Sequence, residues 1–154
     1  MVAAAPATIC LDYLQIVPNK NAKISSTKDK IDDIALRLKD FQRETNSTLI
    51  VISSFNRENY YQPASFSSFK ESGAIEYSAD CLWGMGISVA DGIDGIEYKK
   101  EVIKKSKEKI RDIHFVCLKN RNGGQYDCLF RYYAAHDYFE PYEEEKNERP
   151  RYRR

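Results

Sequence analysis

The sequence has almost no net charge, no long apolar run and no closely spaced cysteines. Its 24 Lys and Arg residues nearly balance 23 Asp and Glu residues, so the formal net charge is +1. Any binding to nucleic acid or to a membrane must therefore come from local patches. No apolar run approaches the length of about 20 residues that a membrane span needs, and residues 1–6 lack the basic region and apolar core of a signal peptide. We expect a cytoplasmic protein with no membrane partner.

The cysteines and histidines give no sign of a disulfide framework or of a metal site. The four cysteines are widely spaced and form no CxxC pair: Cys10, Cys81, Cys117 and Cys128. Three of them lie in apolar surroundings, which favours buried free thiols in a reducing compartment. The two histidines have no ligand partners at metal-binding spacing.

The run Ile9–Val17 is apolar at nearly every position and contains one carboxylate, Asp12. Because it lacks the alternation of a half-buried strand, it predicts a strand covered on both faces, as in the centre of a parallel sheet. A bare Asp there costs on the order of a few kcal/mol unless it has a partner. In nucleotide hydrolases with a phosphate-binding loop, such an Asp helps to hold magnesium. The alternative is an Asp at the strand end that reaches water or caps a turn.

The next segments predict one strand–helix–strand crossover. Ser26 to Asp29 matches a capping box, and apolar residues at helical spacing follow, so we expect an amphipathic helix over 27–45. Asn46 is a plausible stop. Residues 48–53 are β-branched and apolar, which predicts a second buried strand. A strand, a helix and a strand of these lengths make a right-handed βαβ unit with parallel strands.

The rest of the chain alternates between loops, helices and strands. We expect a long loop over 54–70, a short helix over 71–77, a strand over 79–89, a surface helix over 97–110, a strand over 113–118, a hairpin turn at 122–124, a strand over 126–133 and a short extension near 138–139. Residues 1–141 form the predicted folded part. The charged residues 142–154 predict a disordered tail.

Four segments lift this interpretation above a generic α/β domain: LDYLQ at 11–15, SSFNR at 53–57, FKESGAIEYSAD at 69–80 and LKNRNGG at 118–124. Their order and spacing resemble the C-terminal half of the RecA-like motor domain of DnaB-type replicative helicases. The resemblance covers about residues 8–140. It implies a partial RecA-like α/β fold with a mostly parallel central sheet, flanking helices and a C-terminal β-hairpin.

The resemblance also implies two residues at the nucleotide. Asp12 matches the Walker B aspartate, which in the family holds Mg²⁺ through a coordinated water; hard oxygen ligands and a hydrated ion suit Mg²⁺ bound to phosphates. Ser54 stands where the family usually carries Gln, a residue thought to sense the γ-phosphate of ATP. A serine is too short to span the same gap, which puts conventional coupling in question.

Lys70, Glu71 and Gly73 match the family segment that lines the central channel and touches the backbone of single-stranded DNA. Lys70 replaces the usual Arg, which keeps the charge and loses the two-pronged phosphate geometry. A glycine lets the backbone amide approach a phosphate closely. Taken alone, Lys70 and Glu71 favour a solvated ion pair at the start of a helix, because exposed pairs of this kind are common and weak.

Lys119 and Arg121 match a pair that reaches across a subunit boundary to the neighbour's nucleotide. Alternate residues of a strand point the same way, so both cations can address one phosphate site. An arginine finger accelerates phosphoryl transfer by about 10³- to 10⁵-fold. The alternative is a pair of solvent-facing positions beside a hairpin turn.

The long predicted loop carries an aromatic cluster: Phe55, Tyr60, Tyr61, Phe66 and Phe69. Exposed rings beside cations could stack on unpaired bases. The alternative is a loop packed on its own core or on the next subunit.

The phosphate-binding loop G-x-x-x-x-G-K-[ST] is absent from the sequence, as is the family's water-activating glutamate. We therefore expect ATP and Mg²⁺ in a complete domain and no tight binding by this chain alone. Two hypotheses remain. The chain is part of a hexameric helicase that couples ATP hydrolysis to movement on single-stranded DNA, with neighbouring subunits as partners. Alternatively, it is a non-catalytic DNA-binding or ring-interaction module derived from a DnaB-like protein.

Overall fold

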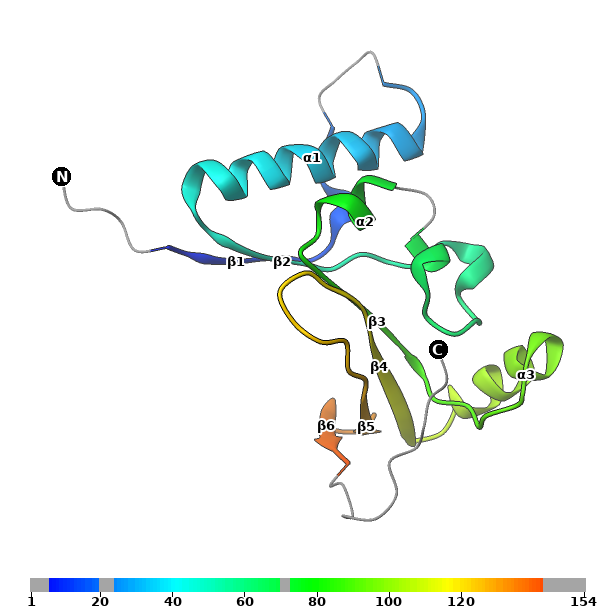
Figure 1. The fold of residues 1–154 in the computed structure, drawn as a ribbon. Helices are drawn as coiled ribbons and strands as arrows, with labels where there is room; N and C mark the ends of the chain where they lie inside the picture. The colour runs from blue at the N-terminus through cyan, green and yellow to red at the C-terminus, as the bar shows by residue number, and fades with distance from the viewer. Residues whose placement is uncertain (1–5, 20–23, 70–72, 143–154) are drawn as a thin grey trace.

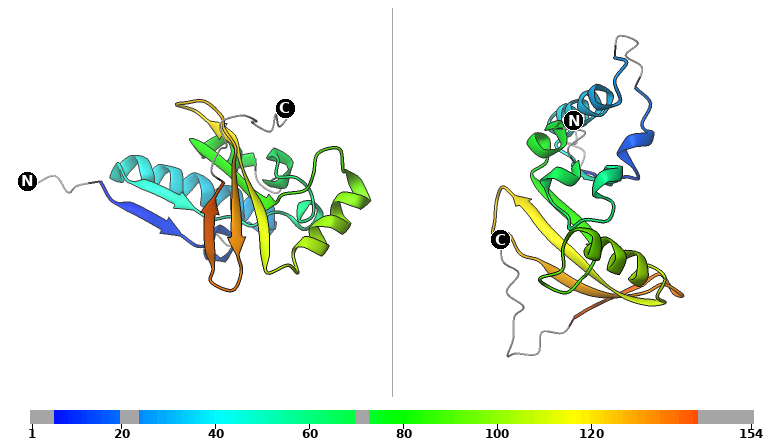
Figure 2. Two further views of the ribbon diagram at one scale, coloured as in Figure 1. Left: turned by 90° about the horizontal axis from the view of Figure 1, so that it is seen from below. Right: turned by 90° about the vertical axis from the view of Figure 1, so that its right-hand side faces the viewer.

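The computed structural model describes residues 6–19, 24–69 and 73–142. The strands are β1 Thr8–Leu11, β2 Thr48–Val51, β3 Cys81–Ile87, β4 Ile110–Asn120, β5 Cys128–Tyr133 and β6 Tyr138–Pro141, and the helices are α1 Thr27–Thr45, α2 Gly73–Ser78 and α3 Gly95–Lys105. Helix α1 lies across β1 and β2, and the strands β3–β6 extend away from them, with α3 at the far end (Figures 1 and 2). None of the described helices is long and apolar enough to cross a membrane.

The predicted crossover is confirmed. Strands β1 and β2 pair in parallel, from Thr8 opposite Thr48 to Leu11 opposite Val51, with α1 between them in the chain. The side chain of Ser26 accepts a hydrogen bond from the backbone N–H of Asp29 at 3.3 Å, which caps the first turn of α1. Asn46 ends the helix in the left-handed conformation, with φ of 50°, a geometry that Asn tolerates better than most residues.

A small apolar core joins α1 to the parallel pair. Leu14 is 2% exposed and contacts Ile31 and Ile34 of α1. Burying one such side chain is worth about 1.5–3 kcal/mol. Around these three pack the partly buried side chains of Leu11, Val17, Leu38 and Ile75. Because Ile75 belongs to α2, the same core fixes α2 against α1.

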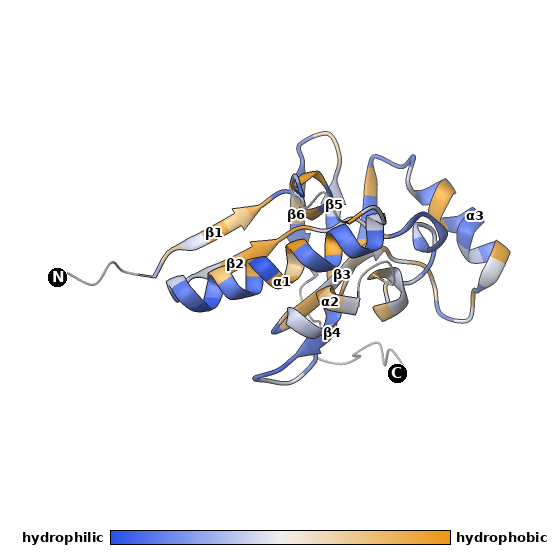
Figure 3. Ribbon diagram, turned by 90° about the horizontal axis from the view of Figure 1, so that it is seen from above, coloured by the Kyte–Doolittle hydropathy of each residue, from blue (hydrophilic) through white to orange (hydrophobic). Residues whose placement is uncertain are grey.

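The expectation that both faces of β1 and β2 are covered is wrong for the described residues. Cys10 is exposed, and Ile50 and Ile52 are each 52% exposed. Cys10 pairs with Ile50, and residues two apart on a strand share a face, so these three side chains form one apolar face. Helix α1 packs against the opposite face through Leu11, and much of the ribbon of β1 and β2 carries the colour of hydrophobic residues (Figure 3). We name Cys10, Ile50 and Ile52 the bare face.

The other strands form an antiparallel sheet in the order β3-β4-β5-β6. The turn at 122–124 reverses the chain between β4 and β5, as predicted, and Met85 of β3 pairs with Phe115 of β4. Trp83 stacks on Phe115 with ring centroids 4.7 Å apart. The α/β class is confirmed, whereas the described strands are mostly antiparallel rather than mostly parallel. Among the described strands, β1 and β2 are the parallel pair, because helix α1 carries the chain back so that both strands run in the same direction. The other neighbouring strands run in opposite directions.

All four cysteines are free thiols, as expected, but two of them are exposed, whereas the sequence predicts apolar surroundings for three. Cys117 is buried and Cys128 is half-buried, whereas Cys10 and Cys81 are exposed. Cys10 is exposed because it lies on the bare face. The tail expected over 142–154 lies outside the described residues after Tyr142.

Candidate functional site

Asp12 and Ser54 lie where the two parallel strands end. The backbone N–H of Ile52 donates to the carbonyl of Leu11 at 2.9 Å, and the N–H of Leu14 donates to the carbonyl of Ile52 at 2.8 Å. The two chains therefore stay side by side just beyond the strand ends. Ligands of α/β sheets bind outside the carboxyl ends of the strands, and this is where the sequence placed the nucleotide.

Gln15 ties the two strand ends together. Its Nε2 donates to Ser53 Oγ at 2.8 Å and to the carbonyl of Ser54 at 3.3 Å. Its Oε1 accepts from the backbone N–H of Ser54 at 3.3 Å. The side-chain amide thus fixes the path of the backbone at Ser54. Gln15 belongs to the LDYLQ motif, but the sequence analysis gave it no role. Its place in this motif is the feature that could have identified it as a site residue.

Asp12 is exposed, so the cost expected for a buried carboxylate does not arise. No hydrogen bond or ion pair joins its side chain to any other described residue. Within the described ranges, no group of three or more His, Cys, Asp or Glu side chains could hold a metal ion. Mg²⁺ is commonly held by one or two carboxylates together with waters and substrate phosphates. An open Asp12 fits such a shared site, and it does not fit a metal centre built from protein alone.

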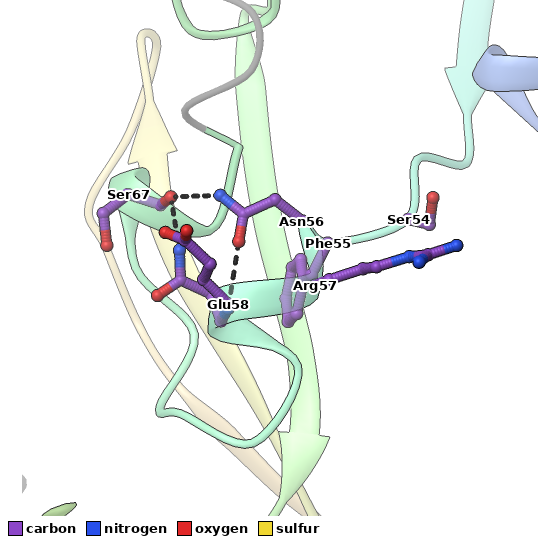
Figure 4. Close-up of a pocket in the computed structure, with 7 residues that line it drawn as sticks. Ser54, Phe55, Asn56, Arg57, Glu58 and Ser67 are labelled. Carbon is purple, nitrogen blue, oxygen red and sulfur yellow. Dashed lines mark hydrogen bonds between the residues drawn. The ribbon is translucent and has the colours of Figure 1, made fainter.

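The segment after Ser54 is held by asparagines. Asn56 Oδ1 accepts from the backbone N–H of Asn59 at 2.9 Å, and Asn56 Nδ2 donates to the carbonyl of Ser67 at 3.2 Å. Asn59 Nδ2 donates to the same carbonyl at 2.8 Å. These bonds close the expected loop into short turns that line an open pocket of about 660 Å³, and Arg57 points away from them (Figure 4).

The aromatic cluster divides into a packed part and an exposed part. Phe69 is buried, and its ring meets Phe55 edge to face with centroids 5.2 Å apart. A Cβ at Gly84 of β3 would lie 2.4 Å from Ala64 Cβ, so only glycine permits this close approach of the loop to the sheet. Tyr60 is 62% exposed and remains available for stacking. Packing within the chain therefore accounts for the aromatic side chains of Phe55 and Phe69, but it does not account for that of Tyr60.

Lys119 and Arg121 lie at the end of β4 and both bind the end of α2. Lys119 Nζ donates to the carbonyl of Glu76 at 2.6 Å. Arg121 donates from one guanidinium nitrogen to Asp80 Oδ1 at 2.7 Å and from another to the carbonyl of Tyr77 at 3.4 Å. The structure therefore brings the predicted pair together, and it shows that neither side chain points freely into solvent.

Asp80 and Lys39 were missed as site residues. Lys39 of α1 donates from Nζ to Asp80 Oδ2 at 2.7 Å, and its side chain is 16% exposed. The hydrogen bond from Lys39 is the main cause that lowers the pKa of Asp80; desolvation opposes it, and the charges of Lys39, Arg121 and Lys119 support it. Asp80 is the last residue of the motif FKESGAIEYSAD, and this position was the only sign in the sequence that Asp80 belongs to the site. Nothing in the helical pattern singled out Lys39.

Of the predicted DNA-contact residues, Lys70 and Glu71 lie outside the described residues. Gly73 is exposed and begins α2. The next backbone N–H, that of Ala74, donates to Asp32 Oδ1 of α1 at 3.2 Å. Among the described residues, a Cβ at Gly73 would meet only the ring of Tyr77, at 3.8 Å, so packing against these residues does not require a glycine here.

Comparison with known proteins gives a consistent result. A family model described as DnaB-like helicase C terminal domain matches residues 4–141. The fold is similar to a solved structure described as an ATPase domain, with a TM-score of 0.69 and 22% identity over 90% of this chain. It is also similar to a DnaB-like replicative helicase solved for its interactions with primase, with a TM-score of 0.65 and 21% identity over 88% of this chain. The chain spans 45% and 31% of those two chains. No curated protein matches the sequence.

Proposed function

Because the chain belongs to the DnaB-like helicase C-terminal domain family, we propose that it provides part of a helicase motor that couples ATP hydrolysis to movement on single-stranded DNA. The observation that carries this proposal is the position of Asp12 and Ser54 at the carboxyl ends of two adjacent parallel strands. The motor would be a ring, a hexamer by resemblance, in which neighbouring subunits share each nucleotide site.

In this proposal Asp12 would hold Mg²⁺ through a coordinated water, and Ser54 would face the γ-phosphate of ATP. Mg²⁺ would supply positive charge that neutralises the phosphates during transfer. The chain's own contribution is positional, because Gln15 fixes the backbone beside Ser54 while the Asp12 carboxylate stays open. The sequence has no G-x-x-x-x-G-K-[ST] loop to cradle the phosphates, so this chain alone would bind ATP weakly and hydrolyse none.

Lys119 and Arg121 would serve the nucleotide of the neighbouring subunit as a trans-acting pair. Lys70, Glu71 and Gly73 would contact the DNA backbone in the channel. The support concerns Gly73, the one member of the DNA-contact set among the described residues: α2 begins at Gly73, and Lys119 and Arg121 bind the carbonyls of Glu76 and Tyr77 near its other end.

The test is activation in trans. The purified chain is mixed with a full-length DnaB-type helicase that has an intact phosphate-binding loop and an alanine in place of its own finger arginine. DNA-stimulated ATP hydrolysis should rise with the wild-type chain and not with Arg121→Ala. Arg43→Ala is the matched control, because the contact of Arg43 among the described residues is an exposed ion pair on α1. Absence of any activation by the wild-type chain would refute the motor proposal.

The bare face favours a second candidate, a non-catalytic module that binds DNA or inserts into helicase rings. A parallel sheet is normally covered on both faces, and Ile50 and Ile52 are each about half exposed. A module of this kind would bind the same finger-deficient helicase without changing its ATP hydrolysis. Binding measured by sedimentation, together with hydrolysis in the same mixture, separates the two candidates.

A further inference from the structure

Four charged side chains from three elements meet beside the end of α2: Lys39, Asp80, Lys119 and Arg121. We name this group the Asp80 clasp. Each carboxylate oxygen of Asp80 pairs with one cation. Oδ2 lies 2.7 Å from Lys39 Nζ, and Oδ1 lies 2.7 Å from a guanidinium nitrogen of Arg121. Lys119 completes the group through the carbonyl of Glu76. The clasp therefore connects α1, the segment between α2 and β3, and the end of β4.

Asp80 holds Arg121 through backbone and side chain together. The backbone N–H of Arg121 donates to the carbonyl of Asp80 at 2.9 Å, while the guanidinium donates to the Asp80 carboxylate. The partner on the other oxygen, Lys39, is itself largely buried. A carboxylate anchored from two sides has little freedom to turn, so it sets the direction of the guanidinium.

The held guanidinium still has capacity for another ligand. Arginine carries five N–H donors in a rigid fork, and two of them are used within the part of the chain that the structure describes, one for Asp80 and one for Tyr77. The Arg121 side chain is 50% exposed. An arginine that is fixed on one side and open on the other is preorganised for an anion, because little freedom is lost when the anion binds.

We propose that Asp80 is a positioning residue that aims Arg121 at the phosphates of a nucleotide held by a neighbouring subunit. This inference rests on the proposed function. Asp80 itself does not touch the nucleotide; it acts through Arg121, and Lys39 acts through Asp80. A displacement of about 1 Å at a catalytic group can cost about 10²-fold in rate. Loss of the Asp80 charge would therefore slow the reaction because it displaces the guanidinium of Arg121.

The experiment uses the activation assay with the finger-deficient helicase. Asp80→Asn keeps the shape and removes the charge that holds both cations. We expect kcat of the activated mixture to fall by about 10- to 100-fold with KM for ATP unchanged, and Asp80→Glu, which restores a carboxylate, to recover most of it. Lys39→Met should give a smaller loss. Asp40→Asn, which breaks an exposed ion pair on the same helix, is the control and should match the wild type.

The outcomes separate this inference from the proposed function. If Arg121→Ala abolishes activation and Asp80→Asn leaves kcat unchanged, the positioning role is wrong and the motor proposal stands. If the wild-type chain fails to activate, the motor proposal is wrong, and with it the purpose assigned to the clasp. The clasp itself is tested on the chain alone by the NMR signal of the Arg121 Nη–H protons, which donate to Asp80 and Tyr77. Asp80→Asn should shift this signal and speed its solvent exchange, and an unchanged signal would overturn the clasp.

Discussion

We predict that the bare face mediates association of this chain and that lysine at both Ile50 and Ile52 weakens it. Full burial of one isoleucine is worth about 1.5–3 kcal/mol. Each side chain is 52% exposed, so covering the remainder is worth roughly half, or about 1–1.5 kcal/mol per residue. Two residues give about 2–3 kcal/mol, which is about a 30- to 150-fold change in dissociation constant.

Sedimentation velocity across a concentration series measures this change directly. The wild-type chain should sediment as a mixture of monomer and associated species, and the double variant should need at least about 30-fold more protein to associate. Leu36→Lys is the control, because Leu36 is 54% exposed on α1 and lies outside the bare face. An equal effect of Leu36→Lys, or unchanged association of the double variant with its fold intact, would refute the reasoning.

Three further predictions concern stability and are measured by urea unfolding followed by circular dichroism. Leu14→Ala should lower the free energy of unfolding by about 2–5 kcal/mol, because Leu14 is 2% exposed in the α1 core. Asn46→Ala should lower it by about 1 kcal/mol, because alanine is strained at φ of 50°. The lowered pKa of Asp80 adds stability that is present above the unfolded pKa of about 3.9 and is lost as the pH falls through the folded pKa. The stability difference between wild type and Asp80→Asn should therefore hold above about pH 5 and shrink as the pH falls from there toward about pH 2.

Each of these stability predictions has a contradicting result. A loss below about 1 kcal/mol in Leu14→Ala would mean that the α1 core does not support the fold. For Asn46, glycine is the control, since it accepts the left-handed conformation; Asn46→Gly as destabilised as Asn46→Ala would remove the conformational explanation. A pH-independent difference for Asp80→Asn would show that its carboxylate has the same pKa in the folded and unfolded chain.

Local features of the fold were predictable because short-range chemistry decides them. The spacing of apolar residues and the Ser26 cap set α1 at Thr27–Thr45, and the Asn46 stop follows from its tolerance of positive φ. The crossover that joins β1 to β2 follows from element lengths alone. The four ordered motifs also placed the chain in its family, which the match over residues 4–141 confirms.

Contacts between distant residues were not predictable in the same way. Asp80 is 41 positions from both Lys39 and Arg121, and no periodic pattern in the sequence links these residues. Gln15 reaches Ser54 across 39 positions. Only the packing of α2 against α1 and the end of β4 determines that Asp80 faces two cations at once.

The sequence by itself determined the elements, the crossover and the motifs, because each depends on residues within one or two helical turns or on their order in the chain. The tertiary structure alone decided which faces are covered and which charges meet. Burial depends on the neighbours that reach a strand, and among the described residues α1 reaches only one face of β1 and β2. That is why a run that predicts a doubly covered strand instead presents an exposed Asp12 and a bare apolar face.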